Sequence, residues 1–237
     1  MKAKKLLHNL NKTLAHHNKW ESEKWTVTTT ADKTKLAYEN REYTFPILPL
    51  RTYQQKLRNY ILNEDGKQAI IIRPRRAGKE TESWSIVIEA AIRTPGLYIM
   101  MYPTKVQGKL VLWSGNIILK NGYSLPFIKF IPPELIARGP LHDELKIYLK
   151  NGSIIWITGC DDNPNRVRGS NARGIVYCEF DFQSPRAYII LRPVFHKNKG
   201  WQILQSTLSG YGYMLNLYEK VKESRDWFTA YDTVLTC

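Results

Sequence analysis

"AIIIRPRRAGKETESW", residues 69–84, carries a basic loop between an apolar run and a stretch with helical character. The β-branched run at 70–72 predicts a short buried strand, and residues 79–93 repeat apolar side chains at helical spacing. A phosphate-binding loop of the form G-x-x-x-x-G-K-S/T occupies such a strand-to-helix junction. Arg73 stands here in place of the first glycine, and Glu80 in place of the magnesium-binding hydroxyl. The stretch therefore predicts a variant of that loop.

The glycine and lysine of the loop have a direct role in such a site. Gly78 lets the backbone approach phosphate oxygens closely, and the N–H groups at the start of the following helix attract anions. Lys79 would neutralise the β- and γ-phosphates, while Arg75 and Arg76 add positive charge. An ordinary basic turn between a strand and a helix is the alternative interpretation. The residues predicted to bind ATP are Gln54, Arg75, Arg76, Ala77, Gly78, Lys79, Glu80 and Thr81.

Other apolar runs predict the rest of the fold. The remaining expected elements are strands at 97–103, 174–180 and 201–207, a hairpin at 145–159 that turns at Asn151-Gly152, and a helix at 51–62. Strands that alternate with helices over this length predict an α/β fold with a mostly parallel central sheet flanked by helices.

Ligands of open parallel sheets bind at the carboxyl ends of the strands. The polar residues that follow the expected strands are 73–79, Glu179 with Asp181, and Ser206 with Thr207. All three sets suit phosphate or water chemistry. We therefore expect these residues to matter for a ligand at the carboxyl ends of the strands.

Glu179, at the end of an expected strand, is a candidate for holding magnesium or orienting water. In P-loop ATPases an acidic pair at the end of this strand holds magnesium and orients the attacking water. Only one acid of the pair is present, because Cys178 occupies the first position. A carboxylate that caps the next helix is the alternative. Tyr53 and Gln54, upstream of the loop, could bind the edge of adenine.

The whole chain is strongly basic and long enough for one large domain. Its 237 residues include 35 Lys and Arg against 21 Asp and Glu, a formal charge of +14. Such a surplus favours a polyanionic partner, most often nucleic acid, although a basic surface retained for solubility would give the same count. The three cysteines have no disulfide or zinc spacing, and no apolar run reaches the length of a signal peptide or a membrane span. We expect a soluble intracellular protein.

Several motifs together resemble the large terminase subunit of tailed bacteriophages. They are "RRAGKE" at 75–80, "PPELIA" at 132–137, the hairpin at 145–154, "RGSNARGIVYCEFDFQSPRAY" at 168–188, "LRPVF" at 191–195 and "GWQILQSTLSGYGYMLNLYE" at 200–219. The similarity covers residues 50–230 and is strongest between 145 and 218. It implies a P-loop NTPase fold of the additional-strand, RecA-like type. It also implies the ATPase motor that moves double-stranded DNA into a procapsid.

The resemblance assigns roles to single residues. Arg75 matches the arginine of the family's Walker A loop that senses the γ-phosphate, with Arg76 in reserve. Ser206-Thr207 match the motif that couples hydrolysis to movement. Arg168 resembles a catalytic arginine that acts in trans on the ATP of a neighbouring subunit, and Arg173 is the second candidate for that role.

Two further matches and two departures belong to the same resemblance. Tyr53-Gln54 match the family's adenine-reading motif, and Glu179 matches its catalytic glutamate. Some relatives carry an acidic residue after the Walker lysine, and some carry Ser in place of Cys178. Magnesium could then be held by Glu80, by Thr81 or largely by water.

The resemblance also implies a domain organisation and a set of partners. Residues 51–237 would form the ATPase domain. The polar and basic composition of residues 1–50, which lie outside the resemblance, predicts an N-terminal basic arm and linker, with a helix followed by a linker or short hairpin. The nuclease domain that normally follows has no counterpart, so no nuclease activity is expected of this chain alone. The implied cofactors are ATP and Mg2+, and the implied partners are double-stranded DNA, the portal protein and the small terminase subunit. In the host cytoplasm the protein would form a homo-oligomeric ring on the procapsid and a monomer in solution.

Two other functions remain open on the sequence. One is a helicase-like ATPase, although 237 residues leave no room for a second motor domain. The other is a non-catalytic basic DNA-binding module with a degenerate P-loop, which Arg73, Glu80 and Cys178 favour.

Overall fold

The computed structural model describes residues 26–30, 33–38, 41–46, 50–118, 124–161, 167, 170–208 and 212–236. Strands β1 (Thr26–Thr30), β2 (Lys33–Tyr38) and β3 (Arg41–Pro46) pair antiparallel in that order. This three-stranded sheet replaces the linker or short hairpin that the sequence suggested. The helix expected before it lies outside the described residues.

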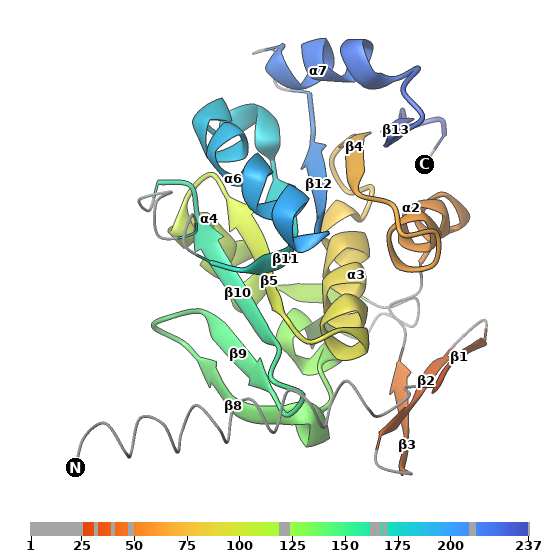
Figure 1. Ribbon diagram of the computed structural model, residues 1–237, viewed down its shortest axis with the longest axis vertical. Coiled ribbons are helices and arrows are strands. Elements are labelled where there is room, and N and C mark those ends of the chain that lie inside the picture. Colours follow the sequence, from red (N-terminus) through yellow and green to blue (C-terminus); the bar gives the residue numbers. More distant parts are fainter. Residues whose placement is uncertain are drawn as a thin grey trace.

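An eight-stranded sheet forms the centre of the molecule (Figure 1). Its order is β13-β4-β12-β11-β5-β10-β9-β8, and the six strands from β13 to β10 run parallel. The strands are β4 (Gln68–Ile72), β5 (Leu97–Tyr102), β8 (Ile136–Leu141), β9 (Lys146–Leu149), β10 (Ile154–Gly159), β11 (Ala172–Cys178), β12 (Trp201–Ser206) and β13 (Trp227–Tyr231). Because β12 lies between β4 and β11, the sheet has the additional-strand arrangement of P-loop ATPases that was expected.

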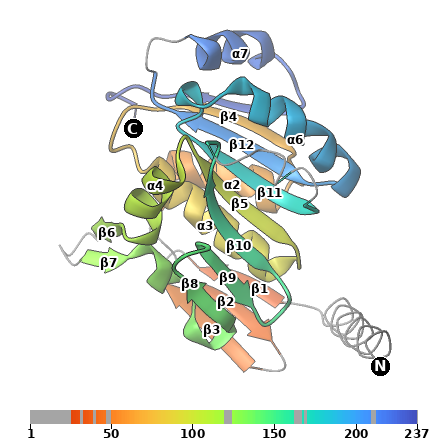
Figure 2. The same ribbon diagram turned by 90° about the vertical axis from the view of Figure 1, so that its left-hand side faces the viewer.

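Helices cover both faces of this sheet (Figure 2). They are α2 (Thr52–Leu62) and α3 (Lys79–Arg93) on one face, and α6 (Pro185–Asn198) and α7 (Tyr213–Val221) on the other. Successive side chains of a strand point to opposite faces. In β4, Ala69 and Ile71 pack with the α3 side, and Ile70 and Ile72 with the α6 side. The uninterrupted apolar run of β4 is therefore the pattern of a strand that is buried on both faces.

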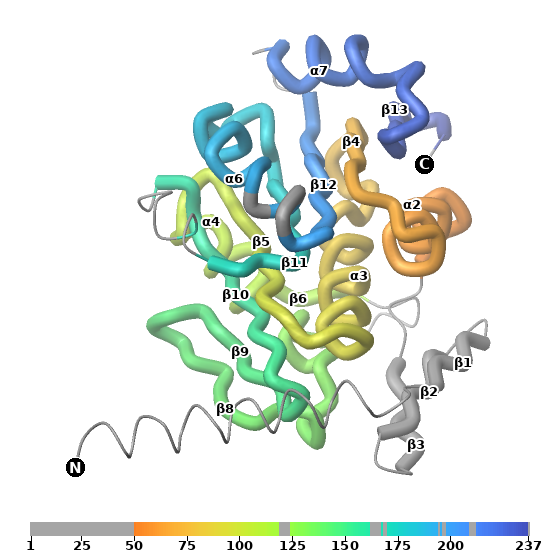
Figure 3. The backbone as a smooth tube through the Cα atoms, in the orientation of Figure 1, coloured from red at the N-terminus to blue at the C-terminus, as the bar shows by residue number. Residues whose placement is uncertain are grey.

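Shorter elements connect β5 to β8, and Figure 3 follows the path of the chain through them. They are α4 (Lys105–Gly108), the π-helix η1 (Lys109–Trp113), the paired strands β6 (Asn116–Ile118) and β7 (Ser124–Pro126), and the 3-10 helices η2 (Phe127–Phe130) and η3 (Pro133–Leu135). A further 3-10 helix, η4 (Phe180–Phe182), follows β11. Within the part of the chain that the structure describes, no helix has the length and apolar character needed to cross a membrane.

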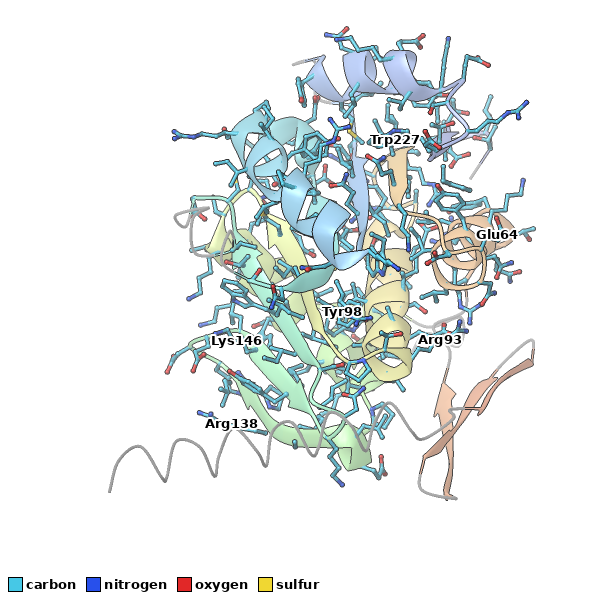
Figure 4. The ribbon with its side chains drawn as sticks, in the orientation of Figure 1. Glu64, Arg93, Tyr98, Arg138, Lys146 and Trp227 are labelled. Carbon is cyan, nitrogen blue, oxygen red and sulfur yellow. The ribbon has the colours of Figure 1, made fainter. Side chains whose placement is uncertain are left out.

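The helices and strands expected between residues 51 and 207 are present, and the sequence missed two strands of the central sheet. Strands β9 and β10 form the predicted hairpin, whose Gly152 has a φ of 87°. That left-handed conformation is one that glycine adopts without a steric penalty. The missed strands are β8, which pairs with β9, and β13, which adds to the edge of the sheet beside β4. Figure 4 labels Trp227, the first residue of β13.

Candidate nucleotide-binding site

The carboxyl ends of β4, β12 and β11 lie side by side. These strands are parallel neighbours, and their register pairs Ile72 with Ser206 and Cys178 with Gln205. The residues that follow the three strands therefore begin at the same edge of the sheet. Contacts of Lys79 with Thr207 and with Glu179 join the three polar sets at this edge.

The loop after β4 has the backbone of an anion-binding turn. Gly78 is the N-cap of α3 and has a φ of 76°, and Arg76 has a φ of 63°. A Cβ atom at Gly78 would approach the Nε2 of Gln54 to 2.8 Å, so both conformation and space require glycine here. The side chains of Arg75 and Arg76 are exposed beside the loop, and the backbone N–H groups at the start of α3 can bind phosphate oxygens.

Tyr53 and Gln54 form hydrogen bonds with the backbone of this loop. The buried Gln54 donates through Nε2 to the carbonyl oxygens of Ala77 (3.2 Å) and Gly78 (3.0 Å), while its Oε1 accepts from the N–H of Arg51 (2.8 Å). The Tyr53 hydroxyl also donates to the Ala77 carbonyl at 2.7 Å. Both side chains thus fix the conformation of the loop. Adenine recognition by the pair stays a prediction.

Lys79 occupies the centre of the site. Its side chain is 4% exposed, and its Nζ lies 2.8 Å from the Thr207 Oγ1 and 3.6 Å from a carboxylate oxygen of Glu179. Two longer contacts reach the carbonyl oxygens of Arg73 (3.4 Å) and Pro74 (3.3 Å). The ammonium group is therefore held at the junction of the three strand ends.

Glu179 and the two expected coupling residues are in direct contact. The Glu179 Oε2 accepts from the Ser206 Oγ (3.3 Å) and from the backbone N–H of Thr207 (3.1 Å). Glu179 has a φ of 53°, an uncommon conformation for a residue other than glycine that is often found at functional sites. The left-handed backbone turns its carboxylate toward the end of β12 rather than onto a following helix.

Asp181, which the sequence grouped with Glu179 without assigning it a role, connects three elements of the site. Its backbone N–H donates to the Ser206 Oγ (3.2 Å), and its Oδ1 accepts from the N–H of Met214 (3.0 Å) in the first turn of α7. Asp181 therefore joins the loop after β11, the end of β12 and the start of α7. The only sequence signal was its position two residues after Glu179.

Glu80 at the start of α3 and Cys178 at the end of β11 stand where two magnesium ligands were expected from the sequence. Burial raises the pKa of the Glu80 carboxyl, Lys79 lowers it, and the charge of Glu179 raises it further. Burial and the nearby Glu80 charge also raise the pKa of the Cys178 thiol well above its usual value. Burial thus favours the neutral thiol form of Cys178. Glu80 and Glu179 supply the carboxylates at this edge.

Arg73 does not point toward a phosphate position. Its guanidinium is buried and bonds to Glu82 of α3 and to Asp232, whose Oδ2 lies 2.6 Å from the Arg73 Nε. The same group stacks on the Tyr53 ring at 4.6 Å. Burial raises the pKa of Glu82 to about 8, although Arg73 opposes this shift. Arg73 stands in place of the first glycine of the standard loop, and its side chain connects β4 to α3 and to Asp232 after β13.

The structure does not bring every predicted site residue to this edge. Arg168 lies outside the described residues. Arg173 is exposed near the start of β11, where its side chain approaches Gly96, at the amino ends of the strands. Thr81 lies in the first turn of α3 and is partly exposed. The described residues contain no cluster of three or more His, Cys, Asp or Glu side chains that could hold a metal ion by themselves.

Comparisons with known proteins point to one fold. No protein-family model matches the sequence, and no curated protein matches it. The ATPase domain of the large terminase from Thermus phage P74-26 superimposes with a TM-score of 0.57 at 14% identity, over 76% of this chain and 80% of that chain. The large terminase of a thermophilic bacteriophage gives 0.59 at 14% identity in complex with ADP and 0.57 at 13% with ATP-γ-S. Both matches cover 77% of this chain and 45% of that terminase. At these identities the likeness establishes the fold alone.

Proposed function

We propose that this chain is the ATP-hydrolysing motor domain of a viral DNA-packaging terminase, which moves double-stranded DNA into a procapsid. The observation that carries the proposal is the convergence of Lys79, Glu179 and Thr207 at the carboxyl edge of an additional-strand sheet. The fold shared with a terminase ATPase domain, and with a large terminase in complex with ADP or ATP-γ-S, supports it. The formal charge of +14 suits a polyanionic partner.

In the proposed site, ATP phosphates lie against the loop that begins α3. Lys79 would exchange its long contacts with backbone carbonyl oxygens for phosphate oxygens, and the N–H groups of the first turn of α3 would add further donors. Arg75 and Arg76 supply positive charge at the open side of the loop. Positioning and charge stabilisation of this kind account for most catalysis of phosphoryl transfer.

Glu179 orients the attacking water in the proposed mechanism. One carboxylate oxygen is fixed by Ser206 and Thr207, while the other faces Lys79, next to the position of the terminal phosphate. A fixed carboxylate there can accept a hydrogen bond from the water and direct it at phosphorus. When the terminal phosphate leaves, the contacts of Lys79 and Glu179 with Thr207 change first. Strand β12 would carry that change toward the DNA-binding surface.

Glu80 and Glu179 are the residues that would hold a magnesium ion at this edge. Glu80 and Glu179 are close enough for the charge of one to raise the pKa of the other, a repulsion that a divalent cation would relieve. Magnesium is commonly held by one or two carboxylates together with substrate phosphates and water. Glu80 and Glu179 would hold it, and when bound it would neutralise charge on the β- and γ-phosphates.

The proposal includes the assembly that the sequence implied. Hydrolysis would take place in a homo-oligomeric ring on the procapsid, with the portal protein and the small terminase subunit as partners. Arg168 of a neighbouring subunit would act in trans on the ATP. DNA would be bound through its phosphates, since a packaging motor has to accept any sequence.

The deciding experiment is ATP hydrolysis by the wild type, by Lys79→Ala and by the matched surface control Lys56→Ala, with and without double-stranded DNA. We expect DNA to stimulate hydrolysis by the wild type and the control, and Lys79→Ala to be inactive. Absence of Lys79-dependent hydrolysis at high protein concentration with DNA would favour the non-catalytic module. Stimulation by single-stranded but not double-stranded DNA would favour the helicase-like ATPase.

A further inference from the structure

A pocket of about 580 Å³ opens at the amino ends of the strands, opposite to the nucleotide-binding site at their carboxyl ends. It lies where β4 and β12 begin and where α6 ends, a junction visible in Figure 1. Gln68 pairs with Gln202 at this end of the two strands, and Ile72 pairs with Ser206 at the other. The same two parallel strands therefore connect the pocket to the site of Lys79 and Glu179.

Every charged residue described in the lining of this pocket is basic. These residues are Lys67 before β4, Arg192 on α6 and Lys199 at the end of α6. Arg192 and Lys199 are exposed, and Lys67 forms an ion pair with the exposed Asp65. Three cations around one concave site favour an anionic ligand.

Two amide side chains in the pocket lining bond to each other, the buried Gln202 and the partly exposed Gln68. Gln202 is 3% exposed, and its Nε2 donates to the Gln68 Oε1 at 3.1 Å. The Gln202 Oε1 has no hydrogen-bond partner among the described residues. A 180° turn of both amides keeps their mutual hydrogen bond and puts an N–H donor at the unpartnered position. The pair can thus present a buried donor to an anion.

The end of α6 would by itself oppose an anion, because helix carboxyl ends carry partial negative charge. Two of the carbonyl oxygens at the end of α6 already accept hydrogen bonds. The Phe195 carbonyl accepts from the N–H of Gly200 (2.9 Å), and the Lys199 carbonyl accepts from the Lys67 Nζ (3.2 Å). The cationic side chains therefore dominate the charge presented to the pocket.

We propose that this pocket binds a backbone phosphate of the double-stranded DNA that the motor moves. The inference rests on the proposed function and gives it a DNA-contact site. Phosphate is the group that the cations and the amide donor fit, and a phosphate contact carries no sequence preference. Because the pocket and the nucleotide site lie at opposite edges, DNA and ATP can be bound at the same time. Strands β4 and β12 provide a rigid connection between them.

The test compares two double variants of equal charge in the full chain. Arg192→Gln with Lys199→Gln removes two exposed cations of the pocket, and Lys56→Gln with Lys220→Gln removes two exposed cations elsewhere. Binding of a fluorescent DNA duplex is measured over a series of salt concentrations. We expect the pocket variant to reduce the slope of log K against log salt by about 0.9, the value for one lost phosphate contact. Affinity at low salt should fall about tenfold or more relative to the control variant.

Further measurements separate the possible outcomes. ATP hydrolysis in the absence of DNA should be the same in the wild type and both variants, and all three should melt at similar temperatures. If the two variants have equal slopes of log K against log salt while the wild type binds DNA, the pocket is not a DNA-contact site and the proposed function still stands. Pocket-dependent binding of inorganic phosphate without a change in DNA binding would also overturn it. If the wild type binds no DNA at all, the proposed function itself is wrong.

Discussion

Replacement of Arg73 by glycine restores the first glycine of the standard phosphate-binding loop, yet we expect it to destabilise the protein. In the structure this arginine is 1% exposed and bonds to two carboxylates, Glu82 on α3 and Asp232 after β13. Its guanidinium also stacks on Tyr53. The variant Arg73→Gly therefore leaves a fully buried glutamate and a mostly buried aspartate without their cation.

The magnitude follows from the burial of these groups. Loss of one partner of a buried ion pair costs about 3–5 kcal/mol, because a desolvated charge is left uncompensated. For a domain of this size, 1 kcal/mol lowers the melting temperature by about 2–4 °C, so the expected fall is about 6–20 °C. The matched control Arg75→Gly removes an exposed arginine from the same loop, and a fall of no more than about 4 °C is expected.

The assay is thermal unfolding without nucleotide, followed by circular dichroism at about pH 9, above the pKa of Glu82, so that this carboxylate is ionised when it loses its cation. A double variant, Arg73→Gly with Glu82→Gln, removes one of the two carboxylates that lose their cation. It should lose less stability than the sum of the two single variants, because the two residues are in contact. A melting temperature of Arg73→Gly within about 3 °C of the wild type would refute the argument. So would strictly additive effects in the double variant.

Four further outcomes are expected. Glu179→Gln should abolish hydrolysis and spare ATP binding, and an equal loss of affinity would indicate a structural or metal-binding role instead. Gly78→Ala should weaken nucleotide binding in a titration, because φ is 76° and the new Cβ would meet Gln54, whereas unchanged affinity would contradict this geometry. Burial raises the folded-state pKa of Glu82 from 4.5 to about 8. The protonated carboxyl is therefore favoured in the folded state, and its contribution to the free energy of unfolding should be fully present below pH 4.5 and lost as the pH rises through 8. Glu82→Gln should remove that fall in unfolding experiments at several pH values. Arg168→Ala mixed with Glu179→Gln should regain part of the lost ATPase activity, and failure of folded, associating variants to do so would argue against action in trans.

The sequence by itself determined the local elements and the edge at which the site forms. The strand, loop and helix at 68–93 could be predicted because their signals are local: a β-branched run, a glycine at the turn and apolar residues at helical spacing. The position of Glu179 and of Ser206-Thr207 at strand ends followed from the same reasoning. Parallel strands bring their carboxyl ends together, so the contacts of these residues with Lys79 were predictable as a group.

Contacts between residues far apart in the chain were decided only by the tertiary structure. Arg73 bonds to Asp232 across 159 positions, and no local pattern marks either residue as the partner of the other. For the same reason the sequence missed β13, whose pairing depends on an unoccupied edge of β4. Asp181 reaches Met214 because two loops meet at one edge of the sheet. Spacing can show which residue types are present in a loop, but only the packed fold determines which charges are buried together and which are left to bind a ligand.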